Sequence, residues 1–390
     1  MKKIVFLIRS LARSGGGGAE KQLTTLAKGL SLKGYDVSVL CFYPDTNSEI
    51  DFSGTSIKLI SLGKQSRWDM AGFFGRLFQQ LKSIQPDVLH SYLPDSNIVT
   101  IFLKPFFPTT KMVWGIRHSN WGDSQLNIER GKKLSKWVRS TLYIEQKLAQ
   151  FADLIIANSH AGQKYHLSQG FPAESMIVIS NGIDVDHFQP DLKTGKTIRQ
   201  EWGISANMIL IGIIGRLHPM KDHSTFLKAA ALVIQERQDV RFICVGGEEQ
   251  QDYARELYEL TNVLGITEQV IWAGARVDMP EVYNALNILV SVSAFGEGFS
   301  NAIGEAMAFG KPCVVTDVGD SALIVGNQGI VVPPNDVQAL KTAVMQLIAE
   351  LNTGNYTQSK IRQRIVENFS VLQLIIKTEN TLLSLFDDSA

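Results

Sequence analysis

Short apolar runs alternate with longer amphipathic stretches from one end of this chain to the other. The runs are rich in valine, isoleucine and leucine, as are parallel strands that are buried on both faces. Their alternation with helical patterns predicts repeated βαβ units and therefore parallel sheets. Strands are expected at residues 3–8, 36–42, 57–61, 87–91, 112–117, 153–157, 176–180, 209–214, 240–245, 270–273, 288–292, 313–316 and 330–332.

Helical patterns fall between these runs, for example at residues 19–33, 70–84 and 371–386. The length of 390 residues exceeds that of a usual domain, and the strand pattern restarts near residue 209. We therefore expect an α/β protein with two doubly wound, Rossmann-like domains, residues 1–187 and 188–370, that face a central cleft. The polar segment 187–196, with a proline and a glycine, is the expected hinge. Ligands of such sheets bind at the carboxyl ends of the strands.

The composition narrows the classes of function. With 45% hydrophobic and 19% charged residues, the chain can bury large cores. Lysine plus arginine equals aspartate plus glutamate, 38 of each, so no basic surplus indicates a nucleic-acid partner. Cys41, Cys244 and Cys313 each lie in an apolar run, which predicts reduced, buried thiols rather than disulfides or a zinc site.

The amino-terminal apolar stretch ends at Arg9, which is short for a secretory signal, and no segment approaches the roughly 20 apolar residues of a membrane span. We therefore expect a cytoplasmic protein that is soluble or bound to the inner face of the membrane.

Most of the chemical information lies in residues 293–319, SAFGEGFSNAIGEAMAFGKPCVVTDVG. A strand, a glycine-rich turn and a helix are expected, with Ser300 as helix N-cap and Gly310 at its end. A helix start suits a diphosphate, because its N–H groups and dipole favour anions. Glu297 on the turn and Glu305 on the helix would suit a sugar at one end and a ribose at the other, because carboxylates accept hydrogen bonds from adjacent hydroxyls. An ordinary strand–turn–helix with two solvated glutamates is the alternative.

This string resembles the E-x7-E element of retaining glycosyltransferases of family 4, which have the GT-B fold. The resemblance implies that Glu297 contacts the transferred hexose and Glu305 the nucleotide ribose. The donor-binding residues that it implies here are Gly298, Phe299, Ser300 and Asn301, whose backbone holds sugar and phosphates.

Further stretches carry the same resemblance. IGIIGRLHPMK, residues 211–221, is similar to the family's G-R-L-x-x-x-K segment, whose cations clamp the donor diphosphate; these are Arg216 and Lys221. GGGGAE, residues 15–20, is similar to its G-G-x-E loop, with Gly17 and Gly18 as the donor-binding glycines. His118 matches a histidine that points toward the reacting sugar.

Other expectations concern the acceptor side. His90 is expected to end a strand and face the cleft, as an acceptor-side or structural residue. Asn181 and Asp184, in VISNGIDVDHF, match another family stretch, with Asp184 orienting cleft residues. The family also implies that the carboxyl-terminal helix, residues 371–387, packs back on the first domain. The sequence departs from the family pattern at VGGEEQQ, after the strand at 240–245. In the family this loop often lies near the nucleotide base, so the resemblance gives less information about which base the donor carries.

The resemblance implies metal-independent transfer with retention, without a cofactor, from a nucleotide sugar to a glycan or polyprenyl-linked acceptor. It favours UDP over GDP and synthesis of cell-surface polysaccharide. His118, Arg216, Lys221 and Glu297 are the expected catalytic residues, and no Asp-x-Asp metal motif is present. A front-face mechanism is the better hypothesis because no carboxylate nucleophile is evident in the first domain.

Basic residues beside aromatic ones, at 68–74, 104–107 and 130–139, suggest contact with an anionic membrane, although core packing of the aromatics explains them as well. Two other functions remain open: a nucleotide-sugar epimerase of the same architecture, and a catalytically silent subunit that binds nucleotide sugars. A nicotinamide dehydrogenase would need fingerprint glycines that the sequence lacks.

Overall fold

The computed structural model describes residues 2–11, 18–43, 52–66, 68–117, 136–353 and 357–387. These divide into two compact units. Unit 1 holds the described residues up to Gly182 and those from Val371 onward, and unit 2 runs from Ile183 to Ser370. The chain thus passes into unit 2 upstream of residue 187, where the boundary was expected.

Unit 1 is built on a seven-stranded sheet in the order β3-β2-β1-β4-β5-β6-β7, and all of its described pairings are parallel. Its strands are β1 (Lys3–Ile8), β2 (Asp36–Cys41), β3 (Lys58–Ser61), β4 (Val88–Tyr92), β5 (Lys111–Ile116), β6 (Leu154–Ala157) and β7 (Met176–Val178). Its helices are α1 (Gly18–Leu32), α2 (Met70–Ile84), α3 (Pro94–Leu103), α5 (Lys136–Leu148), α6 (His160–Ser168) and α15 (Val371–Asp387), with single 3-10 turns at Lys104–Phe106 and Ala149–Phe151.

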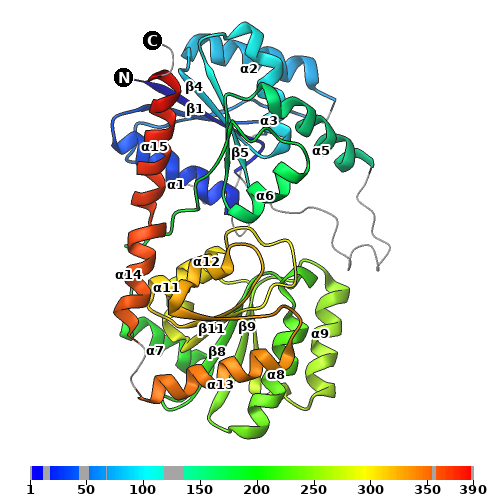
Figure 1. Ribbon diagram of the computed structural model, residues 1–390, viewed down its shortest axis with the longest axis vertical. Coiled ribbons are helices and arrows are strands. Elements are labelled where there is room, and N and C mark those ends of the chain that lie inside the picture. Colours follow the sequence, from blue (N-terminus) through cyan, green and yellow to red (C-terminus); the bar gives the residue numbers. More distant parts are fainter. Residues whose placement is uncertain are drawn as a thin grey trace. The chain divides into compact units, whose positions relative to one another are not determined.

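The helices of unit 1 cover both faces of its sheet. Helices α1 and α15 share a core with the side chains of one face, and α15 runs beside α1 (Figure 1). Helices α2 and α3 share a second core with the other face. Burial on both sides explains why the strands read as unbroken apolar runs.

Unit 2 repeats this architecture with a six-stranded parallel sheet in the order β10-β9-β8-β11-β12-β13. Its strands are β8 (Ile209–Ile214), β9 (Val240–Val245), β10 (Val270–Gly274), β11 (Ile288–Ser291), β12 (Cys313–Thr316) and β13 (Gly329–Val332). Its helices are α7 (Leu192–Glu201), α8 (His223–Glu236), α9 (Gln251–Val263), α10 (Met279–Ala285), α11 (Asn301–Ala308), α12 (Ser321–Val325), α13 (Val337–Thr353) and α14 (Gln358–Phe369), with 3-10 turns at Pro219–Lys221, Thr267–Gln269 and Gly326–Gln328.

Helices α8, α9 and α13 enclose the core on one face of this second sheet, and α10, α11 and α14 enclose the core on the other. In each sheet the strand order reverses at one position, between β1 and β4 in unit 1 and between β8 and β11 in unit 2. The helices that follow these strand pairs pack on opposite faces of their sheet, and in doubly wound folds this position of the carboxyl edge is where ligands bind. The predicted doubly wound α/β fold is therefore confirmed for both units.

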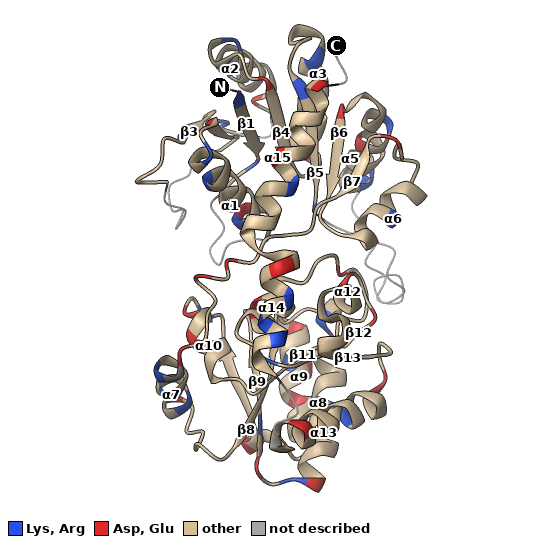
Figure 2. Cartoon of the chain, turned by 60° about the vertical axis from the view of Figure 1, so that its left-hand side comes forward, with Lys and Arg blue, Asp and Glu red and all other residues tan. Residues whose placement is uncertain are grey.

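Charged side chains of both signs occur in both units, and Figure 2 shows them interspersed along the helices. Local groupings of charge, rather than the net charge of zero, therefore decide what the surface attracts. Within the described part of the chain, no helix has both the length and the apolarity needed to cross a membrane.

Gly246, directly after β9, fixes the position of the loop that departs from the family pattern. Its φ angle is +156°, and a Cβ atom there would lie 2.0 Å from the carbonyl oxygen of Gly215. The loop after β9 can therefore approach the loop after β8 only because residue 246 has no side chain.

We expect Gly246→Ala to lower the free energy of unfolding by about 2–4 kcal/mol, because the new methyl group overlaps backbone atoms that cannot move independently. Gly247→Ala is the matched control, since its Cβ would meet its nearest neighbour, the Ala275 Cβ, at an ordinary 3.6 Å. Thermal unfolding followed by circular dichroism measures both. Equal shifts in the two variants would contradict the close approach.

Candidate functional site in unit 2

Two adjacent loops at the carboxyl edge of the unit 2 sheet hold most of the residues predicted to bind the donor. One follows β8 and runs from Gly215 to Lys221, and the other follows β11 and runs to the start of α11 at Asn301. Since β8 and β11 pair in parallel, both loops leave the sheet at the same edge. The Ala294 N–H donates to the Met220 carbonyl at 2.8 Å and ties them together. This is the position at which the strand order reverses.

The two loops are joined by a buried ion pair. Lys221 Nζ lies 2.7 Å from Glu297 Oε2, and their side chains are 16% and 9% exposed. Ser293 Oγ donates to the same carboxylate oxygen at 2.7 Å. A carboxylate this deeply buried needs such partners, because removing it from water alone is costly. The structure thus brings Lys221 and Glu297 together, as the predicted site requires.

The pKa of Glu297 reflects this arrangement. Burial alone would raise it, but the Lys221 ammonium, the Ser293 hydroxyl and the Arg216 guanidinium together hold it below its ordinary value of 4.5. Glu297 is therefore an anion at neutral pH and acts as a hydrogen-bond acceptor.

The backbone around Glu297 rests on the turn that follows β12. Gly319 has a φ angle of +66°, and a Cβ atom there would lie 2.5 Å from the Glu297 carbonyl oxygen. The Asp320 N–H donates to the Gly298 carbonyl at 3.0 Å. The turn that contains Gly319 therefore packs against the glycine-rich loop around Glu297 and stabilises its backbone conformation.

Helix α11 begins where the sequence predicted, and Ser300 occupies its N-cap position. The Ser300 side chain makes no capping hydrogen bond, however, so its expected role as a capping acceptor is not realised. The Phe299 side chain is buried and packs on Phe369 with ring centroids 5.4 Å apart. Only the backbone of Phe299 is therefore available to a ligand, next to the positive end of the helix dipole.

Glu305 lies on the second turn of α11 and is 9% exposed. Its Oε2 atom accepts a hydrogen bond of 2.8 Å from the Tyr283 hydroxyl. Sequence reasoning missed both Tyr283 and Ser293 as partners of the two glutamates. A tyrosine in an amphipathic helix and a serine at a strand end carry no pattern that points to a distant carboxylate.

Arg216 is the more exposed of the two expected cations. Its Nη1 atom lies 2.6 Å from Oε1 of Glu249, and the side chains are 60% and 40% exposed. Glu249 belongs to the unusual loop after β9. An ion pair this exposed contributes little to stability, so an incoming polyanion can replace Glu249 at low cost.

The structure also shows the surroundings of three further predicted residues. Asp184 lies in unit 2, where its Oδ1 accepts from the backbone N–H groups of Asp186 and His187, at 3.2 and 2.9 Å, and so stabilises its own turn. Asn181, in unit 1, is buried and accepts a 3.0 Å hydrogen bond from Arg117. Gly18 is the first residue of α1. Gly17 and His118 lie outside the described residues.

His90 corrects an expectation. It lies in the middle of β4 rather than at its end, is fully buried, and packs between Phe6 and Tyr92 at centroid distances of 5.4 and 4.8 Å. Burial, with a smaller effect of Arg117, lowers its pKa to about 3, so it is neutral at physiological pH. This placement favours the structural role over the acceptor-side one.

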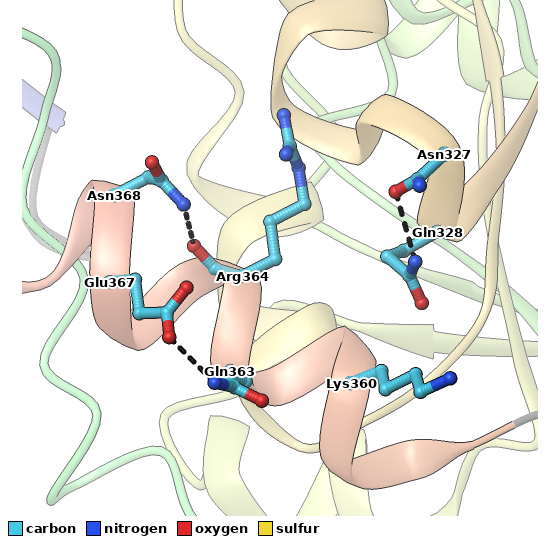
Figure 3. Close-up of a pocket in the computed structure, with 7 residues that line it drawn as sticks. All are labelled: Asn327, Gln328, Lys360, Gln363, Arg364, Glu367 and Asn368. Carbon is cyan, nitrogen blue, oxygen red and sulfur yellow. Dashed lines mark hydrogen bonds between the residues drawn. The ribbon is translucent and has the colours of Figure 1, made fainter.

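The described residues contain no group of three or more histidine, cysteine, aspartate or glutamate side chains arranged to hold a metal ion. A surface hollow of about 290 Å³ lies between the turn that precedes β13 and helix α14, and none of the predicted site residues lines it (Figure 3). Its amides bond to their neighbours, as Gln328 does to Asn327 and Gln363 to Glu367. It is lined by Asn327, Gln328, Lys360, Gln363, Arg364, Glu367 and Asn368.

Comparison with known proteins agrees with this site. Residues 16–187 match the family model described as Glycosyltransferase Family 4, and residues 209–350 match the model described as Glycosyl transferases group 1. The chain belongs to glycosyltransferase family 4. The two matched segments contain all of the predicted donor-binding residues, so the family resemblance read from the sequence is confirmed.

Among the relatives of this family 4 member is the Escherichia coli UDP-Gal:alpha-D-GlcNAc-diphosphoundecaprenol alpha-1,3-galactosyltransferase, 26% identical over 53% of this chain and 54% of that protein. The D-inositol 3-phosphate glycosyltransferase of Thermobispora bispora is 26% identical over 76% of this chain and 72% of that protein. The chain spans about half the length of several of the curated relatives that it matches.

The solved structure of Anabaena Alr3699/HepE in complex with UDP-glucose superposes with a TM-score of 0.80 at 25% identity, over 98% of this chain and 100% of that one. Both the family match and the sheet topology therefore agree with the predicted GT-B fold.

The Lys221–Glu297 pair predicts a pH-dependent stability. Because the folded-state pKa of Glu297 is depressed, its contribution is complete above 4.5 and is lost as the pH falls through the folded-state value. Glu297→Gln should lower the free energy of unfolding by about 3 kcal/mol at neutral pH, since it leaves Lys221 without its anion.

Denaturant titrations from pH 7 downward should show the difference between wild type and Glu297→Gln shrinking below pH 4.5. Glu268→Gln, an exposed glutamate that precedes β10 at the opposite edge of the same sheet, is the matched control and should change little at any pH. A difference that is independent of pH would contradict the ion pair.

Proposed function

We propose that this chain is a retaining glycosyltransferase that moves a hexose or N-acetylhexosamine from a nucleoside diphosphate sugar, with UDP favoured, to a glycan or lipid-linked acceptor. The observation that carries the proposal is the buried Lys221–Glu297–Ser293 cluster at the point where the unit 2 strand order reverses. Family membership supports the same function.

The donor site needs positive charge for the diphosphate and acceptors for the sugar. Lys221 and Arg216 lie on the loop after β8 and supply two cations, and the start of α11 adds its dipole. As the bond from sugar to phosphate breaks, negative charge develops on the leaving diphosphate, and these groups stabilise it. This is our reason for proposing transfer without a resident metal ion or cofactor.

The Glu297 carboxylate is suited to position the sugar. Lys221 and Ser293 both bind its Oε2 atom, so the side chain is fixed before a ligand arrives. Fixed acceptors favour one sugar orientation at little entropic cost. With Glu297 held in an ion pair, we favour the front-face mechanism, in which the leaving phosphate takes the proton of the acceptor hydroxyl. His118 stays a predicted contributor on the basis of the resemblance.

The names of the relatives also support a proposal for the acceptor and for the place of reaction. The name of the Escherichia coli relative specifies a diphosphoundecaprenol-linked acceptor, and the Anabaena protein was solved with UDP-glucose. By analogy we propose a polyprenyl-linked or glycan acceptor, a role in cell-surface polysaccharide synthesis, and reaction at the cytoplasmic face of the membrane.

Exposed aromatic residues of unit 1 support peripheral membrane contact. Trp68, Phe106 and Trp137 are 79%, 65% and 78% exposed, whereas Phe73 and Phe107 belong to the core. Trp137 lies at the start of α5, between the exposed cations Lys136 and Arg139. Exposed aromatics beside cations favour the interface of an anionic bilayer.

The central test is donor binding and hydrolysis across a panel of UDP-, GDP- and ADP-sugars. We expect one nucleotide to bind selectively, with slow release of free sugar in the absence of acceptor. Glu305→Ala should weaken binding at least about tenfold, because a hydrogen bond to a charged group is lost. Calorimetry and product analysis measure both effects.

Glu268→Ala is the matched control and should bind as wild type does. Binding without hydrolysis or transfer to any acceptor would favour a silent subunit, and conversion of the bound sugar to its epimer would favour an epimerase. Failure to bind any nucleotide sugar would contradict the proposal. A covalent glycosyl-enzyme would contradict the front-face mechanism alone.

Membrane contact has its own test. Wild-type protein should sediment with vesicles containing phosphatidylglycerol at low salt and bind poorly to phosphatidylcholine vesicles. Lys136→Ala/Arg139→Ala should weaken this binding about tenfold or more, given a contribution near 1 kcal/mol per cation. Lys193→Ala/Lys196→Ala removes two exposed cations from α7 and is the charge-matched control. Equal loss in both variants would contradict a specific patch on unit 1.

A further inference from the structure

Tyr283 is a buried residue of unit 2 that the predicted mechanism does not use. It lies on α10, is fully buried, and its ring is enclosed by aromatic neighbours. Phe309 stacks on it with centroids 5.7 Å apart, and Phe188 meets it edge-on at 5.9 Å. A ring held in this way can point its hydroxyl in only one direction.

That direction is toward Glu305. The Tyr283 hydroxyl donates to Glu305 Oε2 at 2.8 Å, across 22 residues of sequence and between helices α10 and α11. Burial, together with the nearby Glu305 carboxylate, raises the pKa of Tyr283 well above its ordinary value. The phenol thus stays protonated and donates throughout the physiological pH range.

This bond has a consequence for ligand recognition. A glutamate side chain has three rotatable bonds, and fixing it during binding costs conformational entropy. The tyrosine fixes one carboxylate oxygen in advance, while an ionised carboxylate can accept about four hydrogen bonds in all. The hydrogen bond from Tyr283 alone therefore does not prevent Glu305 from accepting hydrogen bonds from vicinal hydroxyl groups of a ligand.

We propose that Tyr283 is a positioning residue that orients the Glu305 carboxylate for hydrogen bonding to the ribose hydroxyls of the donor nucleotide. The inference rests on the proposed function, in which Glu305 contacts the ribose. It adds a residue that does not touch the ligand and acts only through the glutamate. A purely structural tyrosine would instead support the fold and affect all ligands alike.

The test compares two ligands on two proteins. The probes are the nucleoside diphosphate that binds best among UDP, GDP and ADP, and its 2′,3′-dideoxy analogue, which lacks both ribose hydroxyls. Tyr283→Phe keeps the stacked ring and removes only the donor. We expect it to raise the dissociation constant of the ribonucleotide about threefold to tenfold, and that of the dideoxy analogue less than about twofold.

Two controls isolate the hydroxyl. Tyr253→Phe removes a tyrosine hydroxyl from the core on the other face of the same sheet and should leave both dissociation constants unchanged. Phe309→Leu keeps the hydroxyl but loosens the stack that directs it, and should therefore weaken the ribonucleotide more than the dideoxy analogue, by a smaller factor than Tyr283→Phe does. Should Tyr283→Phe fail to fold, replacement of Tyr283 by 4-aminophenylalanine, a weaker donor on the same ring, should give a smaller selective loss.

Equal weakening of both ligands by Tyr283→Phe, or no weakening of either, would overturn the proposal. These outcomes differ from a failure of the proposed function, in which wild-type protein would bind no nucleotide. If wild-type protein binds both ligands equally, Glu305 does not recognise the ribose hydroxyls. The inference about Tyr283 is then wrong, whereas the proposal of donor binding is unaffected.

Discussion

The buried ion pair between Lys221 and Glu297 is the interaction on which the proposed site depends. It joins the loops after β8 and β11, which the sheet topology brings to the same edge. Each charge would be costly to bury alone, so each loop needs the charge that the other loop supplies in order to keep its conformation. Ser293 adds a neutral donor to the same oxygen, which leaves Glu297 ionised in spite of its burial.

Glu305, the second glutamate, is also a buried carboxylate with a hydrogen-bonding partner, but its partner is of a different kind. Glu305 lies on α11 and accepts a hydrogen bond from a neutral tyrosine hydroxyl, whereas Glu297 is paired with a lysine. One carboxylate of the E-x7-E element is thus compensated by a cation and the other by a phenol. The glycines at 246 and 319 complete the site, because each allows two backbone segments to approach more closely than a side chain would permit.

The strands could be predicted from the sequence because they are buried on both faces. The bounds of β1, β8, β9 and β12 agree with the predicted ones, and the other nine differ by one or two residues. The same small uncertainty affected His90, since a shift of the strand end placed it in the middle of β4 and in the core, which favours the structural one of its two expected roles. Family resemblance indicated Lys221 and Glu297 as members of one site but not the ion pair between them. That pair, like Tyr283–Glu305 and Arg216–Glu249, depends on how loops and helices pack. Contacts across 22 or 33 residues leave no local pattern in the sequence.

Hydrogen–deuterium exchange of the full chain with its tightest-binding nucleoside diphosphate tests most directly whether these loops form the donor site. The account predicts slower exchange in two segments of unit 2, residues 215–223 and 293–305, while the segment 326–330 at the surface hollow is unchanged. Protection confined to segments other than 215–223 and 293–305, with the nucleotide demonstrably bound, would contradict the central claim.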